Sequence, residues 1–244
     1  MTRALFPLLA LLTLALFMVS LLTGPAGFGL GESLSALVTG QGEAVTLVMR
    51  EIHLPRAMLA VMVGASLGLS GAALQGYLRN PLAEPGLIGV SGSAALGAVI
   101  AMQTGFAAAF ALALPLSALA GAVFAVLLIL TLAGPRGGSL TLILAGIAIS
   151  ALAGALMSLV LNLSPNPFAT AETVFWLMGS LADRSFSHLW LAAPFMVLGW
   201  ALLVPLGRGL DALSLGEDAA AAMGIGLARL RLRLVLGVAA CVGA

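Results

Sequence analysis

The sequence contains no lysine, and all ten of its cationic residues are arginine. Only 8% of its 244 residues are charged, whereas about a quarter are charged in a typical soluble domain. Because 61% of the residues are hydrophobic and the mean hydropathy is +1.18, we expect an integral membrane protein. The missing lysine excludes a P-loop ATPase, since the phosphate-binding loop of that class requires a lysine. If ATP drives this protein, a separate subunit must hydrolyse it.

Cysteine and histidine are also scarce. Cys241 is the only cysteine, which excludes an intramolecular disulfide and a cysteine metal cluster. His53 and His188 are isolated in the sequence, and an isolated interfacial histidine is more often structural than a haem or iron ligand. We therefore predict no metal site and no cofactor. A net charge of +1 without a basic tract does not indicate nucleic-acid binding.

Long runs without charge predict an all-α, polytopic helical bundle with six complete membrane spans and the start of a seventh. The 51-residue run Pro85–Pro135 is too long for one span, and the polar sequence Gln103-Thr104-Gly105 is the expected division. A short surface helix is expected near Glu172–Leu181. The spans are expected at about residues 5–22 and 57–78, twice within 85–135, at 139–161 and 189–206, and from Leu232 onward. The whole chain, 1–244, is interpreted as a single transmembrane domain.

The arginines predict the orientation of these spans, because cytoplasmic loops are enriched in positive charge. With the N-terminus inside, seven arginines lie on the cytoplasmic side and three outside. The cytoplasmic group is Arg3, Arg79, Arg136, Arg208, Arg229, Arg231 and Arg233; the outer group is Arg50, Arg56 and Arg184. We therefore predict a multi-pass inner-membrane protein whose N-terminus and segment 208–231 are cytoplasmic.

Small residues recur at every fourth position in four of the predicted spans, which places them along one ridge of each helix. In a membrane such ridges allow two helices to approach closely. The glycines assigned to helix packing on this basis are Gly64, Gly68, Gly76, Gly89, Gly97, Gly146 and Gly154. The segment Gly64–Gly68 also matches the G-x-S-x-G pattern of serine hydrolases. That motif requires a strand-to-helix elbow and a histidine base, so packing is the preferred interpretation.

The polar segment before the last span is predicted to contain a short helix. Ser214 and Glu217 have the spacing of a capping box, and Gly224 is suited to end the helix. A short helix with an Ala and Met surface favours a docking element for a cytoplasmic partner over a simple loop. No Asp, Glu, Arg or His lies in the middle of a predicted span, which argues against an ion-coupled secondary transporter. A structural membrane scaffold remains an alternative.

Several separated motifs resemble those of the membrane permeases of ABC importers for iron-siderophores, haem and vitamin B12, the FecCD-type family. The resemblance extends over nearly the whole chain from residue 50. The motifs are His53-Leu54-Pro55-Arg56, the segment 69–98 with LRNPLAEPG, LILAGIAIS at 142–150, ETVFWLMGSLADRSFSHLW at 172–190, and DALSLGEDAAAAMGIGLARLRLRL at 211–234.

This resemblance implies roles for particular residues. The coupling element that contacts the ATPase subunit would comprise Ser214, Leu215, Gly216, Glu217, Ala219, Met223 and Gly224. The start of the fifth span, Ser139, Leu140 and Thr141, would lie near the cytoplasmic gate, although Ser139 is equally well interpreted as an ordinary helix cap. Arg56, with Arg50 and His53, would dock a periplasmic binding protein. His53 departs from the family, which usually has Arg there. Arg50 could instead form a local pair with Glu51 or Glu43, which would contribute little.

The resemblance also implies partners: cytoplasmic ABC ATPase subunits, a periplasmic substrate-binding protein and a second permease subunit in a homodimer within the lipid. The chain is expected to move an iron chelate, a ferric siderophore or haem, with vitamin B12 as the alternative, and to have no catalytic residue of its own. The family subunit has ten membrane helices. A chain ending at Ala244 is therefore expected to be a fragment or a truncated product.

Overall fold

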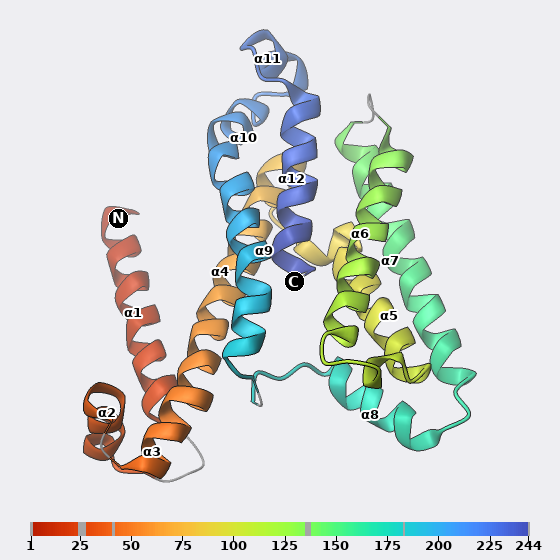
Figure 1. Ribbon diagram of the computed structural model, residues 1–244. Coiled ribbons are helices and arrows are strands. Elements are labelled where there is room, and N and C mark those ends of the chain that lie inside the picture. The colour runs from red at the N-terminus through yellow and green to blue at the C-terminus, as the bar shows by residue number, and fades with distance from the viewer. Residues whose placement is uncertain (1, 24–27, 41, 135–137, 183, 244) are drawn as a thin grey trace. The chain divides into compact units, whose positions relative to one another are not determined.

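A computed structural model describes residues 2–23, 28–40, 42–134, 138–182 and 184–243, and every regular element in these ranges is helical (Figure 1). The predicted all-α fold is therefore confirmed. The chain divides into two compact units. The first comprises residues 1–64 and 180–193, and the second comprises residues 65–179 and 194–244.

The first unit is built around the long helix α1 and the start of α4. Its elements are α1 (Thr2–Leu22), α2 (Leu30–Thr39), α3 (Glu43–Val48), a π-helical turn (Met49–His53) and the first part of α4 (Leu54–Leu78). Its small core consists of Leu21, Ala36, Met49 and Ala57. The first turns of α9 (Phe186–Leu203) also belong to this unit.

The second unit holds the remaining helices. After α4 come a 3-10 turn (Pro85–Ile88), α5 (Val90–Gln103), a second 3-10 turn (Phe106–Ala108), α6 (Ala113–Ala133), α7 (Ser139–Asn162) and α8 (Pro167–Leu177). The rest of α9 leads through a 3-10 turn (Val204–Leu206) into α10 (Gly207–Leu213), α11 (Glu217–Ala222) and α12 (Leu227–Val242). Leu74, Ile129, Leu234 and Val235 are fully buried in its core.

Five helical segments of the described chain have the length and apolar character to cross a membrane. They are Ala4–Leu22, Glu43–Leu78, Ala113–Ala133, Ser139–Asn162 and Phe186–Leu213. The span predicted at the start of 85–135 is the apolar helix α5, but α5 has only 14 residues and is shorter than predicted. Gly89 precedes it with φ +77°, and Thr104-Gly105 ends it, so the predicted division is confirmed.

Two helices, α8 and α12, begin about five residues earlier than predicted. The surface helix expected from Glu172 begins at Pro167, because Asn166 Oδ1 accepts hydrogen bonds from the amides of Phe168 and Ala169. Proline is well suited to the first position of a helix. The last helix begins at Leu227 and not at Leu232, so its first two turns contain Arg229, Arg231 and Arg233.

Candidate functional site

The segment predicted to contact an ATPase forms the connection α10–α11–α12 at one end of the second unit (Figure 1). The predicted capping box is wrong. The Ser214 hydroxyl donates to the Asp211 carbonyl at 2.6 Å, and the residue that precedes α11 is Gly216. Residues 214–216 form the turn that ends α10, and Gly216 has φ +112°, a conformation that favours glycine. Gly224, with φ +84°, follows the end of α11 as predicted.

The side chains of this segment divide into an exposed and a buried set. Leu215 is 72% exposed and Met223 is 54% exposed, so two large apolar side chains flank α11. Ala219 is half-buried and Ala220 is completely buried. A partner could therefore contact Leu215 and Met223, whereas a charge placed at Ala220 would test the core and not the docking surface.

Glu217 connects this segment to the start of α7. A Cβ added at Gly138 would lie 3.9 Å from both carboxylate oxygens of Glu217. Gly138 is the residue that precedes α7, so the carboxylate lies beside the partially positive N-terminus of that helix. The charges of Glu217 and of Arg231 on α12 both act on the hydroxyl group of Tyr77 on α4. The Glu217 carboxylate of α11 thus lies beside the first turn of α7.

The residues predicted near the cytoplasmic gate form the first turn of α7. The cap is Gly138 and not Ser139, so the interpretation of Ser139 as the helix cap is wrong. Ser139 is half-buried, while Leu140 and Thr141 are exposed. The Gly137 part of the expected Gly137-Gly138 turn lies outside the described residues. The structure therefore brings the predicted gate residues next to Glu217 of the predicted coupling helix.

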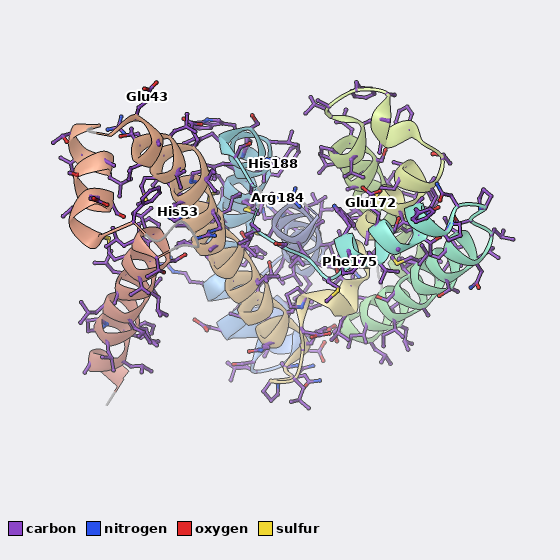
Figure 2. All side chains as sticks on the ribbon, turned by 90° about the horizontal axis from the view of Figure 1, so that it is seen from below. Glu43, His53, Glu172, Phe175, Arg184 and His188 are labelled. Carbon is purple, nitrogen blue, oxygen red and sulfur yellow. The ribbon has the colours of Figure 1, made fainter. Side chains whose placement is uncertain are left out.

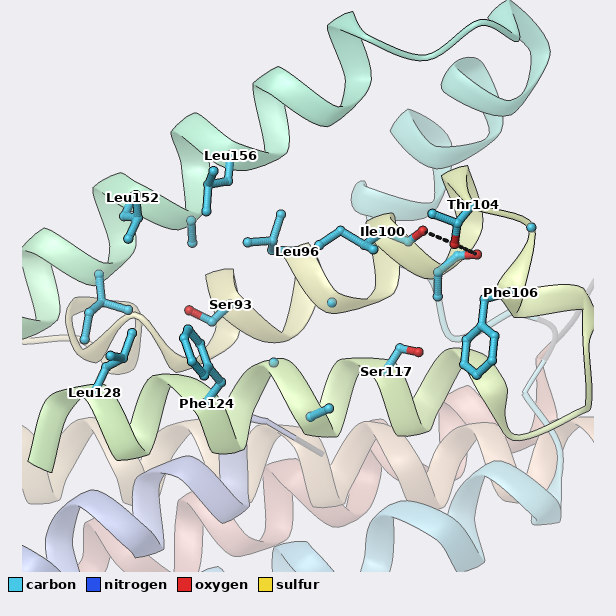
Figure 3. A pocket seen from close by; sticks show the side chains of 17 residues that line it. Ser93, Leu96, Ile100, Thr104, Phe106, Ser117, Phe124, Leu128, Leu152 and Leu156 are labelled. Carbon is cyan, nitrogen blue, oxygen red and sulfur yellow. Dashed lines mark hydrogen bonds between the residues drawn. The ribbon is translucent and has the colours of Figure 1, made fainter. Parts of the chain in front are cut away.

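An apolar cavity of about 890 Å³ lies between α5, α6 and α7 (Figure 3). Leu96, Ile100, Phe124, Leu152 and Leu156 line it, and Ser93, Thr104 and Ser117 supply a few hydroxyl groups. It lies within the membrane-spanning part of the second unit, since α6 and α7 are both candidate spans. Such a lining suits apolar chains or another helix better than it suits an ion.

Of the seven glycines assigned to helix packing, four have a close neighbour. Cβ atoms added at Gly97 and Gly146 would collide with the Ser117 and Leu87 carbonyl oxygens. At Gly89 the nearest atom is the Ser150 amide nitrogen at 2.9 Å, and at Gly76 it is Leu210 Cβ at 3.4 Å. No described atom lies within 4 Å of an added Cβ at Gly64, Gly68 and Gly154. At these three positions the structure does not supply the close packing that the spacing predicts.

The hydrolase-like segment lies inside α4, and no strand-to-helix elbow is present there. Ser66 is buried, and its hydroxyl accepts a hydrogen bond from Trp200 Nε1 at 3.0 Å. The serine thus joins α4 to α9, which is a packing role. The described residues contain no cluster of three or more His, Cys, Asp or Glu side chains that could hold a metal ion.

The three residues predicted to dock a binding protein contact the ends of neighbouring helices. His53 is only 4% exposed and its Nδ1 lies 3.0 Å from the Leu21 carbonyl oxygen at the end of α1 (Figure 2). Arg50 donates to the Leu37 carbonyl oxygen near the end of α2 at 2.9 Å, and Arg56 approaches Thr23 O at 3.5 Å. Helix C-termini leave carbonyls that cations satisfy well. The docking prediction for His53 is therefore wrong, because its ring is buried.

Replacing His53 with alanine is expected to destabilise the first unit. The buried Leu21 carbonyl would lose its hydrogen-bond partner, and such a loss costs about 1–3 kcal/mol. The measurement is thermal unfolding of the chain in detergent. His53→Asn is the matched control, because its amide can donate to the same carbonyl and should restore part of the stability. Equal unfolding temperatures for wild type, His53→Ala and His53→Asn would contradict this assignment.

The sequence interpretation missed the role of Gln103, which fastens α8 to the end of α5. Gln103 Nε2 donates to Thr173 Oγ1 at 3.0 Å and to the Ala169 carbonyl at 3.3 Å. Its Oε1 accepts from Ser164 Oγ at 2.6 Å. Thr173 is fully buried, whereas Phe175 of the same helix is exposed (Figure 2). In the sequence, Gln103 stands out only as a polar residue at a helix end. Its polarity does not identify the residues to which it bonds.

Gln103→Leu is therefore expected to release α8 from α5. The buried Thr173 hydroxyl would lose a donor, and a cysteine placed at half-buried Ala169 in a Cys241→Ser background should become more exposed and react faster with maleimide. Thr104→Val is the control, because the Thr104 hydroxyl bonds only to carbonyls of its own helix, Ile100 and Ala101. Labelling rates that are the same in both variants would refute the fastening role.

Comparison with known proteins gives a match to the FecCD transport family over residues 12–244. This chain belongs to the FecCD transport family. The FecCD chain is 36% identical over 207 residues to the cobalamin import system permease BtuC of Halobacterium salinarum, covering 84% of this chain and 55% of that protein. It is 35% identical to the vitamin B12 import permease BtuC of Klebsiella pneumoniae, covering 96% of this chain and 68% of that one.

Two further similarities concern iron and metal chelates. The FecCD chain is 34% identical to the Fe(3+)-citrate import permease YfmE of Bacillus subtilis, covering 97% of this chain and 72% of YfmE. A solved structure described as an inward-facing conformation of a metal-chelate type ABC transporter matches with a TM-score of 0.83 and 31% identity. That match covers 100% of this chain and 75% of the other. The FecCD chain thus spans about half to three quarters of the lengths of these relatives, and it is a multi-pass inner-membrane protein.

Proposed function

We propose that this FecCD chain is all or part of the permease subunit of an ABC importer, driven by a separate ATPase subunit. The observation that supports this most directly is the α10–α11–α12 connection. It exposes Leu215 and Met223 beside α11, and it places Glu217 against the N-terminus of α7. A protein that binds the exposed side chains and moves α11 would also move the start of α7. The permease relatives support the same role.

In this proposal the seven residues of the coupling element have different tasks. Leu215 and Met223 contact the ATPase subunit, and Gly216 and Gly224 supply the positive φ angles at the two ends of α11. Ser214 ends α10, and Ala219 lies between the exposed and buried faces of α11. Glu217 passes the movement to Ser139, Leu140 and Thr141 at the cytoplasmic gate. The chain itself performs no catalysis, because ATP is hydrolysed by the partner.

The arginine bias supports an N-terminus in the cytoplasm, with segments 79–84 and 208–231 on the same side. Arg136, one of the arginines in this argument, lies outside the described residues. A single cysteine at Glu84 in a Cys241→Ser background is expected to resist an impermeant maleimide applied outside the cell. A cysteine at exposed Phe175 of α8 is expected to react. Labelling of the cysteine at position 84 without permeabilisation would indicate the opposite orientation in the membrane.

The outer surface is proposed to receive a substrate-binding protein. Arg50 is exposed and Arg56 is half-exposed, so both can offer cationic groups to acidic residues, whereas buried His53 cannot. A second permease subunit is proposed to complete the pathway as a homodimer.

The proposed substrate is an iron chelate, and a ferric siderophore or haem fits this class. The similarity to an Fe(3+)-citrate permease and to a metal-chelate transporter favours it. Vitamin B12 is the second candidate, because two of the similar permeases import cobalamin.

The test is uptake by proteoliposomes that contain the permease, its ATPase subunit and its binding protein, with ATP enclosed. We expect ATP-dependent accumulation of radioactive iron chelate and none of cobalamin. Accumulation of cobalamin alone would favour the second candidate. Uptake driven by an ion gradient in vesicles without the ATPase would instead indicate a secondary transporter and refute the importer.

A further inference from the structure

Three arginines line one small pocket where the last described helix begins. Arg208 lies on α10, and Arg229 and Arg233 lie on α12. All three are exposed, and together they line a cavity of about 280 Å³. No described acidic side chain lines this cavity, and none of the three makes a hydrogen bond or an ion pair with another described residue. Three like charges around one cavity favour an anion there.

Three glycines in the backbone of the pocket leave room for the arginine side chains. A Cβ added at Gly226 would lie 3.3 Å from Arg229 Nε, so the guanidinium folds against a residue without a side chain. Gly226 also precedes the first turn of α12, whose N-terminus has partial positive charge. Gly209 and Gly224 line the same cavity. The arginines can therefore approach a bound group together with a helix end.

The face of α12 that holds the arginines continues as an apolar surface. Arg229, Arg233 and Leu236 are spaced four and three residues apart, which places them on one side of the helix. Leu236 is exposed, as is Val204 in the turn that leads to α10. A cationic pocket thus adjoins exposed apolar side chains within a membrane protein. A free anion would bind only the arginines. A phospholipid can place its phosphate in the cationic pocket and its acyl chains against the apolar side chains.

We propose that this pocket binds the phosphate of an anionic phospholipid. Guanidinium groups form bidentate hydrogen bonds with phosphate oxygens, and clustered basic residues at a membrane surface are attracted to anionic lipids. The bound lipid would hold α10 and the start of α12 at the membrane surface, on either side of α11. The proposal goes beyond the ATPase contact and rests on the membrane location of the chain alone.

The experiment is a titration of the purified chain in neutral detergent with fluorescent phosphatidylglycerol and fluorescent phosphatidylcholine. We expect saturable binding of phosphatidylglycerol that weakens as salt is added. The triple variant Arg208→Gln, Arg229→Gln, Arg233→Gln should bind it about a hundredfold more weakly, which is about fivefold for each arginine. The three positions are exposed, so the variant should fold. Its thermal unfolding without added lipid checks this.

Arg79→Gln is the matched control, because Arg79 lies outside the pocket and on the same predicted side of the membrane. Its affinity for phosphatidylglycerol should equal that of the wild type. A triple Arg→Lys variant should keep part of the affinity, since lysine retains the charge and loses the bidentate geometry.

Three results would overturn the proposal. The first is equal phosphatidylglycerol affinity in wild type and the triple Gln variant. The second is displacement of the lipid by inorganic phosphate at equal concentration, which would make the site one for a free anion. In the third, the triple Gln variant keeps its lipid binding and loses only co-purification with the ATPase subunit. The arginines would then belong to the ATPase contact.

Discussion

Replacing Gly97 with alanine is expected to prevent α5 and α6 from packing together. The added Cβ would collide with the Ser117 carbonyl oxygen and would lie 3.0 Å from the Ser117 carbonyl carbon. Both are backbone atoms, so no rotamer change relieves the contact, and the helices would have to separate along their crossing. Gly121 meets the Ser93 backbone in the same way from the opposite helix. We expect each variant to lose about 3 kcal/mol or more, measured as thermal unfolding and aggregation in detergent.

The matched control is Gly154→Ala on α7. No described atom lies within 4 Å of an added Cβ there, and alanine is favoured over glycine in a helix by about 1 kcal/mol. This variant should unfold at the wild-type temperature or slightly above it, and Gly68→Ala should behave in the same way. If Gly97→Ala and Gly154→Ala were equally stable, the close crossing of α5 and α6 would be disproved.

The second large effect is expected at the surface of α11. The double variant Leu215→Ala, Met223→Ala should bind the ATPase subunit about thirtyfold more weakly, because a loss of about 1 kcal/mol for each exposed apolar side chain adds up to about 2 kcal/mol. ATP-driven uptake should fall with the affinity. The measurement is binding of the purified ATPase subunit to the permease in detergent, followed by uptake in proteoliposomes.

Leu163→Ala is the control, because Leu163 is 73% exposed, close to the exposure of Leu215, and follows the opposite end of α7. It should bind the ATPase normally. Gly216→Ala is a second test of the same surface. A φ of +112° costs alanine about 1–3 kcal/mol of strain, so α11 should shift while Leu215 and Met223 are unchanged. Unaltered ATPase binding by both the double variant and Gly216→Ala would exclude α11 as the docking helix.

The sequence was sufficient for features that depend on neighbouring residues. Charge-free runs located the long helices, since the length of an apolar segment is a local property. Gln103-Thr104-Gly105 was identified as a helix end because it is polar within a long apolar run. Gly224 was identified because glycine adopts positive φ angles readily. The absence of lysine excluded a P-loop ATPase, and the ordered motifs indicated the family that the comparisons show.

The sequence was not sufficient to place helix ends where one residue pattern fits two local structures. Ser214 and Glu217 have capping-box spacing, but the Ser214 hydroxyl bonds to Asp211 of the preceding helix. The sequence Asn166-Pro167 is typical of a turn, but here it starts α8, whose beginning was expected near Glu172. Each pattern is compatible with either the end of one element or the start of the next.

The tertiary structure alone decided which faces meet. A four-residue spacing places Gly97, Gly146 and Gly154 on ridges in the same manner, but only the arrangement of the other helices determines that the first two are covered and that Gly154 has no close neighbour. The same holds for His53, whose burial depends on the end of α1, 32 residues earlier in the chain. A residue pattern specifies the face of a helix. Contacts between residues far apart in the sequence determine what that face packs against.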